Sequence, residues 1–240
     1  MSDIQCRTLL EVVVESMQEI FHLVNRGVDK RKIFLDKQDY FRFIHDLFEF
    51  NDRRILESTS RPFQKLPDIE CRTVEQKPRK LLVRIYAFCL MPNHYHLLVS
   101  PCMKDGIPKF MHKVNMGYSK YFNIKYERSG TLFQGRYKFV RVQKEIHFLY
   151  LPYYIHFNPL DLKFPEWRDY KIHNYKDAVQ FLESYRWSSH LDYLGKKNFP
   201  SITQRDFLLE IFEGVEGYRD RLYSWLKEAD LSEMRKLILE

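Results

Sequence analysis

Two long apolar segments, separated only by a tight turn, place the strongest constraint on the fold of this chain. Residues 81–89 (LLVRIYAFC) and 94–100 (HYHLLVS) are rich in the apolar, β-branched and aromatic side chains that favour β-strands. Between them, the pair Pro92-Asn93 is typical of a turn. The two segments therefore predict a β-hairpin, around which the rest of the chain has to be arranged.

The remaining periodicity predicts helices that alternate with further strands. Polar residues 53–80, which include three prolines, indicate a loop or an insertion. The order β-α-β-β-α-β-α matches, in its first six elements, the ferredoxin-like split βαβ pattern. We expect an α+β fold with an antiparallel sheet, helices on one face and a mostly helical C-terminal extension. Besides the hairpin, we predict strands at 20–26 and 136–142, a helix from Asp36 or Asp39 to about Asp52, and helices at 108–127 and 144–157.

Positive charge is concentrated in one part of the sequence. The chain of 240 residues has a net charge of +7. Residues 111–145 contain eight basic residues against Glu127 and Glu145, a net charge of +6, and seven aromatic residues. Clustered cations with interleaved rings suit a nucleic-acid backbone and its bases. The alternative interpretation is a solvated amphipathic helix with a buried aromatic stripe.

The cysteines and the absence of a long apolar run indicate a cellular compartment. Four cysteines form no CxxC pair, which is typical of free thiols in a reducing environment. No apolar run is long enough to cross a membrane, and the first residues lack the features of a signal peptide. We expect a cytoplasmic, nucleoid-associated protein that does not bind membranes.

Two histidines stand two residues apart in the second strand of the predicted hairpin. Residues i and i+2 of a strand point to the same face, so His94 and His96 project side by side while Tyr95 points away. Two imidazoles on one face are a ready pair of nitrogen ligands for a divalent metal. The spacing alone also fits hydrogen-bonded core histidines, or polar side chains on a solvent-facing sheet.

A second pattern lies in the last predicted helix. Tyr154 and Asn158 are four residues apart and therefore share one helix face. A phenol and an amide oxygen one turn apart could supply a nucleophile and a third metal ligand. The alternatives are a core tyrosine and an asparagine that ends the helix before Pro159. Tyr150 and Tyr153 are rival nucleophiles, and Pro152 should kink the helix or begin its working part.

These motifs appear together and in one order, which makes them more specific than any of them alone. The chain resembles the single-tyrosine HUH transposases of short insertion sequences, and especially the REP-associated tyrosine transposases. The resemblance covers roughly residues 20–195, with 53–80 left out. It is carried by FHLVNRG (21–27), AFCLMPNHYHLLVSP (87–101), GYSKYFN (117–123), SGTLFQGRYK (129–138), YYIHFNPL (153–160) and RWSSHLDYLG (186–195).

The resemblance implies a catalytic role for particular residues. His94 and His96 match the family's two metal-ligating histidines, Tyr154 matches the catalytic tyrosine, and Asn158 falls where the family completes its metal site. The implied ion is Mg²⁺ or Mn²⁺, and the nitrogen-rich ligand set favours Mn²⁺ or an ion that keeps several waters. A metal-dependent DNA transposase of this kind cleaves and rejoins single-stranded DNA through a 5′-phosphotyrosine intermediate.

The resemblance also implies a DNA partner and a division of the chain. The partner would be single-stranded DNA with a hairpin nearby, and a homodimer is one assembly left open. Residues 1–160 would form the catalytic domain, with 53–80 as an insertion, and residues 161–240 a C-terminal extension. The residues expected to contact DNA are Lys113, Lys120, Lys125, Arg128, Gln134, Arg136 and Lys138.

Two other functions compete with an active transposase. A non-catalytic or domesticated nucleic-acid-binding protein could keep the same fold, although His94, His96, Tyr154 and Asn158 are all present. A structural zinc protein is disfavoured, because no cysteine-rich ligand set accompanies the histidines. A covalent tyrosine–DNA adduct is expected of the active transposase alone.

Overall fold

The computed structural model describes residues 19–53, 79–169 and 171–228. Most of the predicted insertion, from residue 54 to residue 78, lies outside these described residues, as do Cys6 and Cys71. None of the helices in the described part of the chain combines the length and the hydrophobicity that a bilayer crossing requires.

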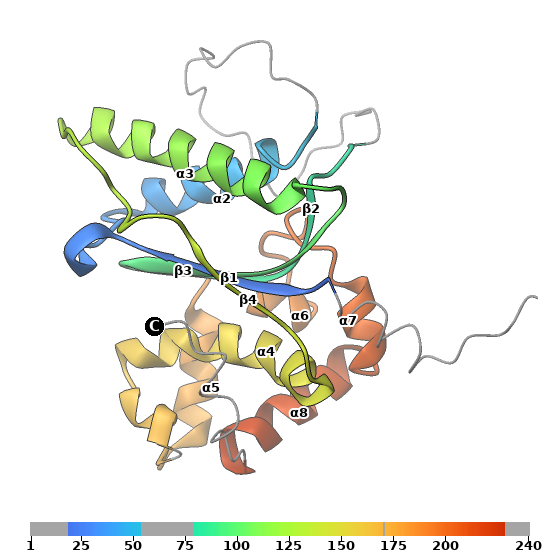
Figure 1. Ribbon diagram of the computed structural model, residues 1–240. Helices are drawn as coiled ribbons and strands as arrows, with labels where there is room; N and C mark the ends of the chain where they lie inside the picture. Colours follow the sequence, from blue (N-terminus) through green and yellow to red (C-terminus); the bar gives the residue numbers. More distant parts are fainter. Residues whose placement is uncertain (1–18, 54–78, 170, 229–240) are drawn as a thin grey trace, which may run out of the picture.

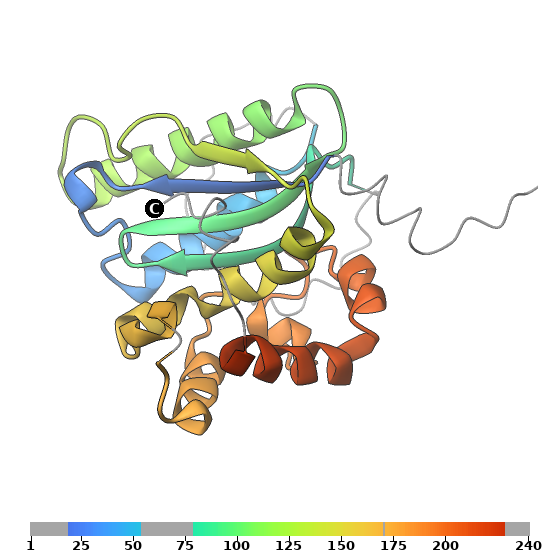
Figure 2. The ribbon, with the colours of Figure 1, turned by 60° about the horizontal axis from the view of Figure 1, so that its bottom comes forward.

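Four strands form one antiparallel sheet. They are β1 (Phe21–Arg26), β2 (Val83–Met91), β3 (His94–Pro101) and β4 (Lys138–Arg141). Their order is β2-β3-β1-β4, and each neighbouring pair is antiparallel (Figure 2). This is the strand order of a ferredoxin-like split βαβ fold, so the predicted hairpin and fold class are confirmed.

Helices cover both faces of the sheet. Helices α2 (Lys37–Glu49) and α3 (Gly106–Lys125) lie on one face, as predicted for the two crossover helices (Figure 1). Helix α4 (Glu145–Phe157) lies on the opposite face together with the C-terminal helices. Each face has its own hydrophobic cluster, so the sheet is the middle layer of three.

The C-terminal part is mostly helical in its described residues, as predicted. Segment 187–189 also runs along the outer edge of β2: Leu90 N donates to Trp187 O at 2.9 Å, and Ser189 N donates to Phe88 O at 3.0 Å. This contact covers a sheet edge that would otherwise expose backbone polar groups. The remaining elements are η1 (Val28–Lys30), η2 (Asn158–Leu162), η3 (Pro165–Asp169), α5 (Tyr175–Ser184), α6 (His190–Tyr193), α7 (Asp206–Ile211) and α8 (Gly214–Glu228).

The hydrophobic cluster around α4 takes side chains from both sides of residue 160. Phe148, Leu151 and Ile155 of α4 belong to the same cluster as Leu208 and Leu222 of the C-terminal helices. The proposed domain division at residue 160 stays a prediction, and this cluster packs across it.

Helix α4 continues through Pro152, which is buried inside it. The sequence led us to expect that this proline would kink the helix or start a new one. The helix runs from Glu145 to Phe157, and every residue from His147 to Phe157 except Leu149 is buried. Burial within the protein supports the helix where proline removes a backbone hydrogen bond, which costs about 3 kcal/mol or more in a helix interior.

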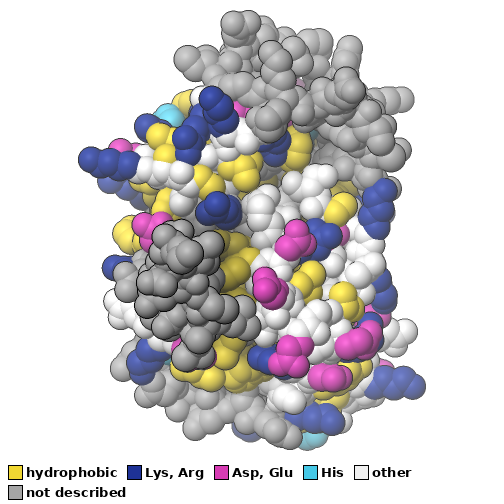
Figure 3. Space-filling view, turned by 90° about the vertical axis from the view of Figure 1, so that its right-hand side faces the viewer, with side chains coloured by type: hydrophobic (Ala, Val, Ile, Leu, Met, Phe, Trp, Pro, Cys, Tyr) yellow, Lys and Arg dark blue, Asp and Glu magenta, His cyan; other side chains and the backbone are white. Residues whose placement is uncertain are grey.

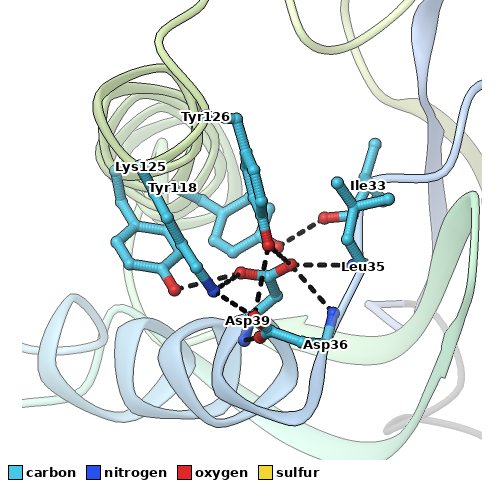
Figure 4. Close-up of polar contacts among 8 residues, drawn as sticks. Ile33, Leu35, Asp36, Asp39, Tyr118, Lys125 and Tyr126 are labelled. Carbon is cyan, nitrogen blue, oxygen red and sulfur yellow. Dashed lines mark hydrogen bonds and ion pairs between the residues drawn. The ribbon is translucent and has the colours of Figure 1, made fainter.

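A buried carboxylate joins α2 to α3 (Figure 4). Asp36 caps α2 and forms a capping box with Asp39, which confirms the predicted start of this helix. The side chain of Asp39 is fully buried and accepts hydrogen bonds from Lys125 Nζ at 2.7 Å, Tyr126 Oη at 2.7 Å and Leu35 N at 2.7 Å. Burial lowers the pKa of Lys125, but the hydrogen bonds to Asp36 and Asp39 outweigh this effect and raise it.

We expect Asp39→Ala to destabilise the protein by about 3 kcal/mol, because it leaves the partly buried donors Lys125 and Tyr126 without their buried acceptor. Asp36→Ala is the matched control. Its side chain is 50% exposed, so its loss should cost only about 1 kcal/mol, the usual value of an N-cap. Urea unfolding measures both changes. An equal loss in the two variants would contradict the central role of Asp39.

Candidate active site

The predicted histidine pair lies on the face of the sheet that α4 covers. The rings of His94 and His96 have centroids 4.9 Å apart, and the residues are 5% and 0% exposed. Tyr95 points the other way, where its ring packs at 4.7 Å from Phe43 of α2. The alternation that the sequence predicted is therefore present, and it separates the imidazoles from the apolar cluster under α2 and α3.

A third histidine, which the sequence analysis did not single out, supports this pair. His22 of β1 is fully buried, and its Nε2 lies 2.9 Å from Nδ1 of His96. On the other side, Nδ1 of His94 lies 2.6 Å from Oδ1 of Asn93. Because both rings use Nδ1 in these contacts, each would bind a metal ion through Nε2. The contact at Nδ1 would then fix the orientation of the ring.

Tyr154 approaches the histidines from α4 of the same chain. Its ring centroid is 6.0 Å from that of His22 and 6.0 Å from that of His96. The residue is only 2% exposed. Since one chain brings the phenol to the imidazoles, no second copy is needed to assemble this part of the site.

The rival tyrosines of α4 face the C-terminal helices. Tyr153 stacks on Tyr218 of α8 with ring centroids 4.9 Å apart, and burial raises its pKa. Tyr150 packs against Trp225 of α8 at 4.8 Å. The structure thus separates Tyr154 from Tyr153, which packs on Tyr218, whereas Tyr150 shares a helix face with Tyr154 and its ring lies 6.2 Å from that of Tyr154.

Asn158 follows the last residue of α4 and is fully buried. Its Nδ2 donates to the backbone oxygen of Tyr154 at 2.9 Å, and its Oδ1 accepts from Arg168 Nη2 at 3.4 Å. The structure therefore brings Asn158 to Tyr154, whose ring in turn contacts His96.

The donor set suits a divalent ion. Imidazole nitrogen accepts Mn²⁺ and other transition ions, and an amide oxygen is an acceptable ligand for Mg²⁺ or Mn²⁺. Within the described ranges, no group of three or more histidine, cysteine, aspartate or glutamate side chains could hold an ion. Among the described residues, a third protein ligand beside His94 and His96 would be of another type, as the amide of Asn158 is.

The residues predicted to contact DNA divide into two groups. Lys120, Gln134, Arg136 and Lys138 are exposed on the second half of α3, on the following loop and on β4. The other three make intramolecular contacts: Lys113 Nζ donates to Asp52 O, Arg128 Nη1 donates to Asn123 Oδ1, and Lys125 pairs with Asp36 and Asp39.

The charge is unevenly spread over the surface. On the side shown in Figure 3, Lys and Arg side chains lie mainly along the rim, whereas Asp and Glu side chains gather in the lower half. That side does not form one continuous basic surface.

A second polar network lies between α4 and the C-terminal part of the chain. His156, two residues after Tyr154, faces the C-terminal helices: its Nδ1 is 2.8 Å from Tyr218 Oη and its Nε2 is 2.7 Å from Ser189 Oγ. Nδ1 of His190 lies 2.8 Å from the same Tyr218 hydroxyl. Burial, and then the charge of Lys196, lowers the pKa of His190 to about 3. This histidine is therefore neutral in the folded protein at neutral pH.

The comparisons with known proteins agree with the motifs. Residues 70–158 match the model of the family described as "Transposase IS200 like", and this segment contains His94, His96, Tyr154 and Asn158. The resemblance inferred from the sequence is thereby confirmed over this segment, which is similar to the IS200-like transposases.

A solved structure also matches the chain. It is described as "Structure of the REP associates tyrosine transposase bound to a REP hairpin", and the match has 12% identity and a TM-score of 0.43. It covers 79% of this chain and 87% of that chain. A comparison with curated proteins found no match.

We expect the buried His190 to make the protein less stable in acid. Between pH 6.5 and about 3 the unfolded chain binds a proton here that the folded chain does not, so the free energy of unfolding falls as the pH falls. The stability difference between the wild type and His190→Gln should therefore shrink by about 2 kcal/mol from pH 7.5 to pH 5. Urea unfolding at both pH values measures it, with the exposed His173→Gln as the control. A difference independent of pH would contradict this account.

Proposed function

We propose that this protein is a metal-dependent transposase that cleaves and rejoins single-stranded DNA through a 5′-phosphotyrosine at Tyr154. One observation carries the proposal: a single chain places the ring of Tyr154 beside His96, which forms an adjacent pair with His94. A nucleophile next to a pair of side chains that can bind a metal ion is an arrangement suited to phosphodiester cleavage.

The reaction at Tyr154 is a transesterification. The phenolic oxygen attacks the scissile phosphorus, a bond from Tyr154 Oη to phosphorus forms, and the bond from phosphorus to the 3′ oxygen breaks. The proton of the phenol ends on the released 3′-hydroxyl, so the step is balanced. The covalent bond keeps the free energy of the phosphodiester, and a second 3′-hydroxyl can reverse the reaction onto a new end without ATP.

His94, His96 and Asn158 would hold the Mg²⁺ or Mn²⁺ ion. When bound, such an ion polarises the phosphate and offsets the charge that develops during attack, which matters because a phenol with an ordinary pKa near 10 is a poor nucleophile. The chain's own part is orientation: His22 and Asn93 fix the two ligand rings, and the hydrogen bond from Asn158 to the Tyr154 backbone oxygen fixes the end of α4.

Single-stranded DNA, with a hairpin nearby, would follow the exposed basic residues of the α3–β4 region. Lys120, Arg136 and Lys138 can follow the phosphates, and Gln134 can donate hydrogen bonds beside them. The pairing of Lys125 with Asp36 and Asp39 makes it the weakest member of the predicted set. A role on genomic DNA would place the protein in the cytoplasm with the nucleoid, and the homodimer stays a prediction.

We expect Tyr154→Phe to abolish a covalent protein–DNA adduct and to leave DNA binding unchanged. Tyr153→Phe is the matched control, because it removes a hydroxyl from the same helix at a position that packs on Tyr218 of α8. The assay uses the full chain, Mn²⁺ or Mg²⁺, and labelled single-stranded hairpin oligonucleotides from the DNA that flanks the gene, resolved on a denaturing gel.

Three outcomes of that assay are decisive. The mechanism would be supported if the wild type and Tyr153→Phe form the adduct. Tyr154→Phe should not form it, and EDTA should abolish it. Adduct that persists in Tyr154→Phe would remove the tyrosine from its role. Tight binding of every oligonucleotide without any adduct would favour the binding protein on the same fold.

We expect Arg136→Ala and Lys138→Ala each to weaken DNA binding and to lower its dependence on salt. Each lost phosphate contact should reduce the slope of log K against log salt by about 0.7 for a single strand. Lys196→Ala is the control, because Lys196 is a basic residue of the C-terminal part and pairs with Glu183. Fluorescence anisotropy at several salt concentrations measures the slopes. If the slopes of Arg136→Ala and Lys138→Ala equal that of the wild type, these two residues do not contact the DNA phosphates.

A further inference from the structure

A cationic side chain lies at the hydroxyl of Tyr154. Arg168 belongs to η3 of the C-terminal part, and its Nη1 is 3.4 Å from Tyr154 Oη. Its Nη2 is 3.4 Å from Asn158 Oδ1. One guanidinium group thus contacts the phenol oxygen and the amide oxygen that the sequence motif places one helical turn apart.

A carboxylate holds this guanidinium in place. Asp161 of η2 accepts from Arg168 Nε at 2.8 Å and from Nη2 at 2.6 Å, which is a two-pronged, charge-assisted pair. Trp167 Nε1 also donates to Asp161 at 2.6 Å. Because Nε and Nη2 are directed at Asp161, the plane of the guanidinium is fixed and Nη1 is the nitrogen presented to Tyr154.

Arg168 is also more exposed than the described aromatic side chains that pack on the ring of Tyr154. The other side chains that pack on the Tyr154 ring are His22, His96, Tyr150 and Trp167, and each of these residues is at most 4% exposed. The side chain of Arg168 is 28% exposed. Among these neighbours, Arg168 is therefore the group that an anionic substrate meets on its way to the hydroxyl.

We propose that Arg168 is a catalytic residue of the Tyr154 reaction, whose guanidinium binds a non-bridging oxygen of the phosphate under attack, and that Asp161 is its positioning residue. The inference rests on the function proposed above and adds a group that the sequence motifs do not contain. Arginine suits the task because its charge is permanent and its planar fork matches phosphate geometry.

The geometry explains what the cation does in each direction of the reaction. During cleavage, Tyr154 Oη forms a bond to phosphorus while the 3′ oxygen leaves and takes up the phenol's proton. The non-bridging oxygens are one bond from that phosphorus, so they arrive beside Oη and within reach of Nη1. During rejoining, the phenolic oxygen leaves with negative charge next to the same cation. Arg168 therefore stabilises charge that is larger in the transition state than in the bound substrate.

A purely structural role for Arg168 would have a different signature. The pair with Asp161 links η2 to η3, so its loss could loosen this part of the chain without any effect on phosphate charge. The two roles are separated by a substrate whose scissile phosphate is replaced by a methylphosphonate, in which a methyl group takes the place of one charged oxygen. Because this substrate lacks one negative charge at the phosphate, a cation there should accelerate its reaction much less.

The experiment measures single-turnover formation of the Tyr154 adduct by the full chain on both substrates. The proteins are the wild type, Arg168→Ala, Arg168→Lys and Asp161→Asn, each with its oligonucleotide Kd and thermal unfolding midpoint. On the phosphodiester, Arg168→Ala should react about 100-fold more slowly at an almost unchanged Kd, as expected for the loss of one preorganised donor. Arg168→Lys and Asp161→Asn should be intermediate. On the methylphosphonate, the defect of Arg168→Ala should fall below about 10-fold.

Two results would overturn the inference. One is a wild-type rate in Arg168→Ala on the phosphodiester, and the other is an equal slowing on both substrates, which a structural role predicts. If Arg168→Ala does not fold, Arg168→Lys and Asp161→Asn make the same comparison between substrates. Failure of the function itself is distinguishable, because then the wild type forms no adduct, or one that Tyr154→Phe also forms, and the role of Arg168 falls with it.

Discussion

The alternation of side chains along β3 ties the site to the fold. This strand lies between β1 and β2 and is covered on both faces, so successive residues enter different layers. Tyr95 and Leu97 belong to the hydrophobic cluster under α2 and α3, whereas His96 contacts His22 and Tyr154 on the α4 side. A register shift of one residue would exchange the two sets. The packing that stabilises the sheet therefore also decides where the imidazoles point.

Much of this fold could be predicted from local patterns, because strands and helices of ordinary length carry their periodicity in the sequence. The hairpin and a cap of α2 at Asp36 or Asp39 follow from such patterns, and the order of the elements along the chain indicates the ferredoxin-like pattern. The irregularities do not. A register shift between Ile85 and Ala87 lets both Tyr86 and Ala87 join the cluster on the α4 face. This shift in which face successive side chains occupy depends on what packs against β2, and the nine residues of β2 alone do not predict it.

Apart from what the family resemblance implies, the candidate site was predictable only where short spacing determines contact. His94 and His96 share a strand, and Tyr154 and Asn158 share a helix turn, so their pairing follows from geometry. His22 lies 74 residues from His96, and its place beside that ring depends on the pairing of β1 with β3. Its position in the motif FHLVNRG was the available signal, but the face it occupies needs the register. Charge counting fails for a similar reason: Lys125 belongs by composition to the basic block, yet it is paired with Asp36 and Asp39.

Helix α4 shows why the C-terminal part belongs to the chemistry of the site. Residues 146–160 contain no charged side chain, so the helix is fixed by burial rather than by ion pairs. Tyr154 and His156 stand about 200° apart around the helix axis, and each face has its own contacts: His22 and His96 meet Tyr154, while Tyr218 and Ser189 bond His156. Two polar networks on opposite faces resist rotation of the helix. The segment after residue 160 thus supplies both the helices that set the angle of Tyr154 and the cation that lies at its hydroxyl.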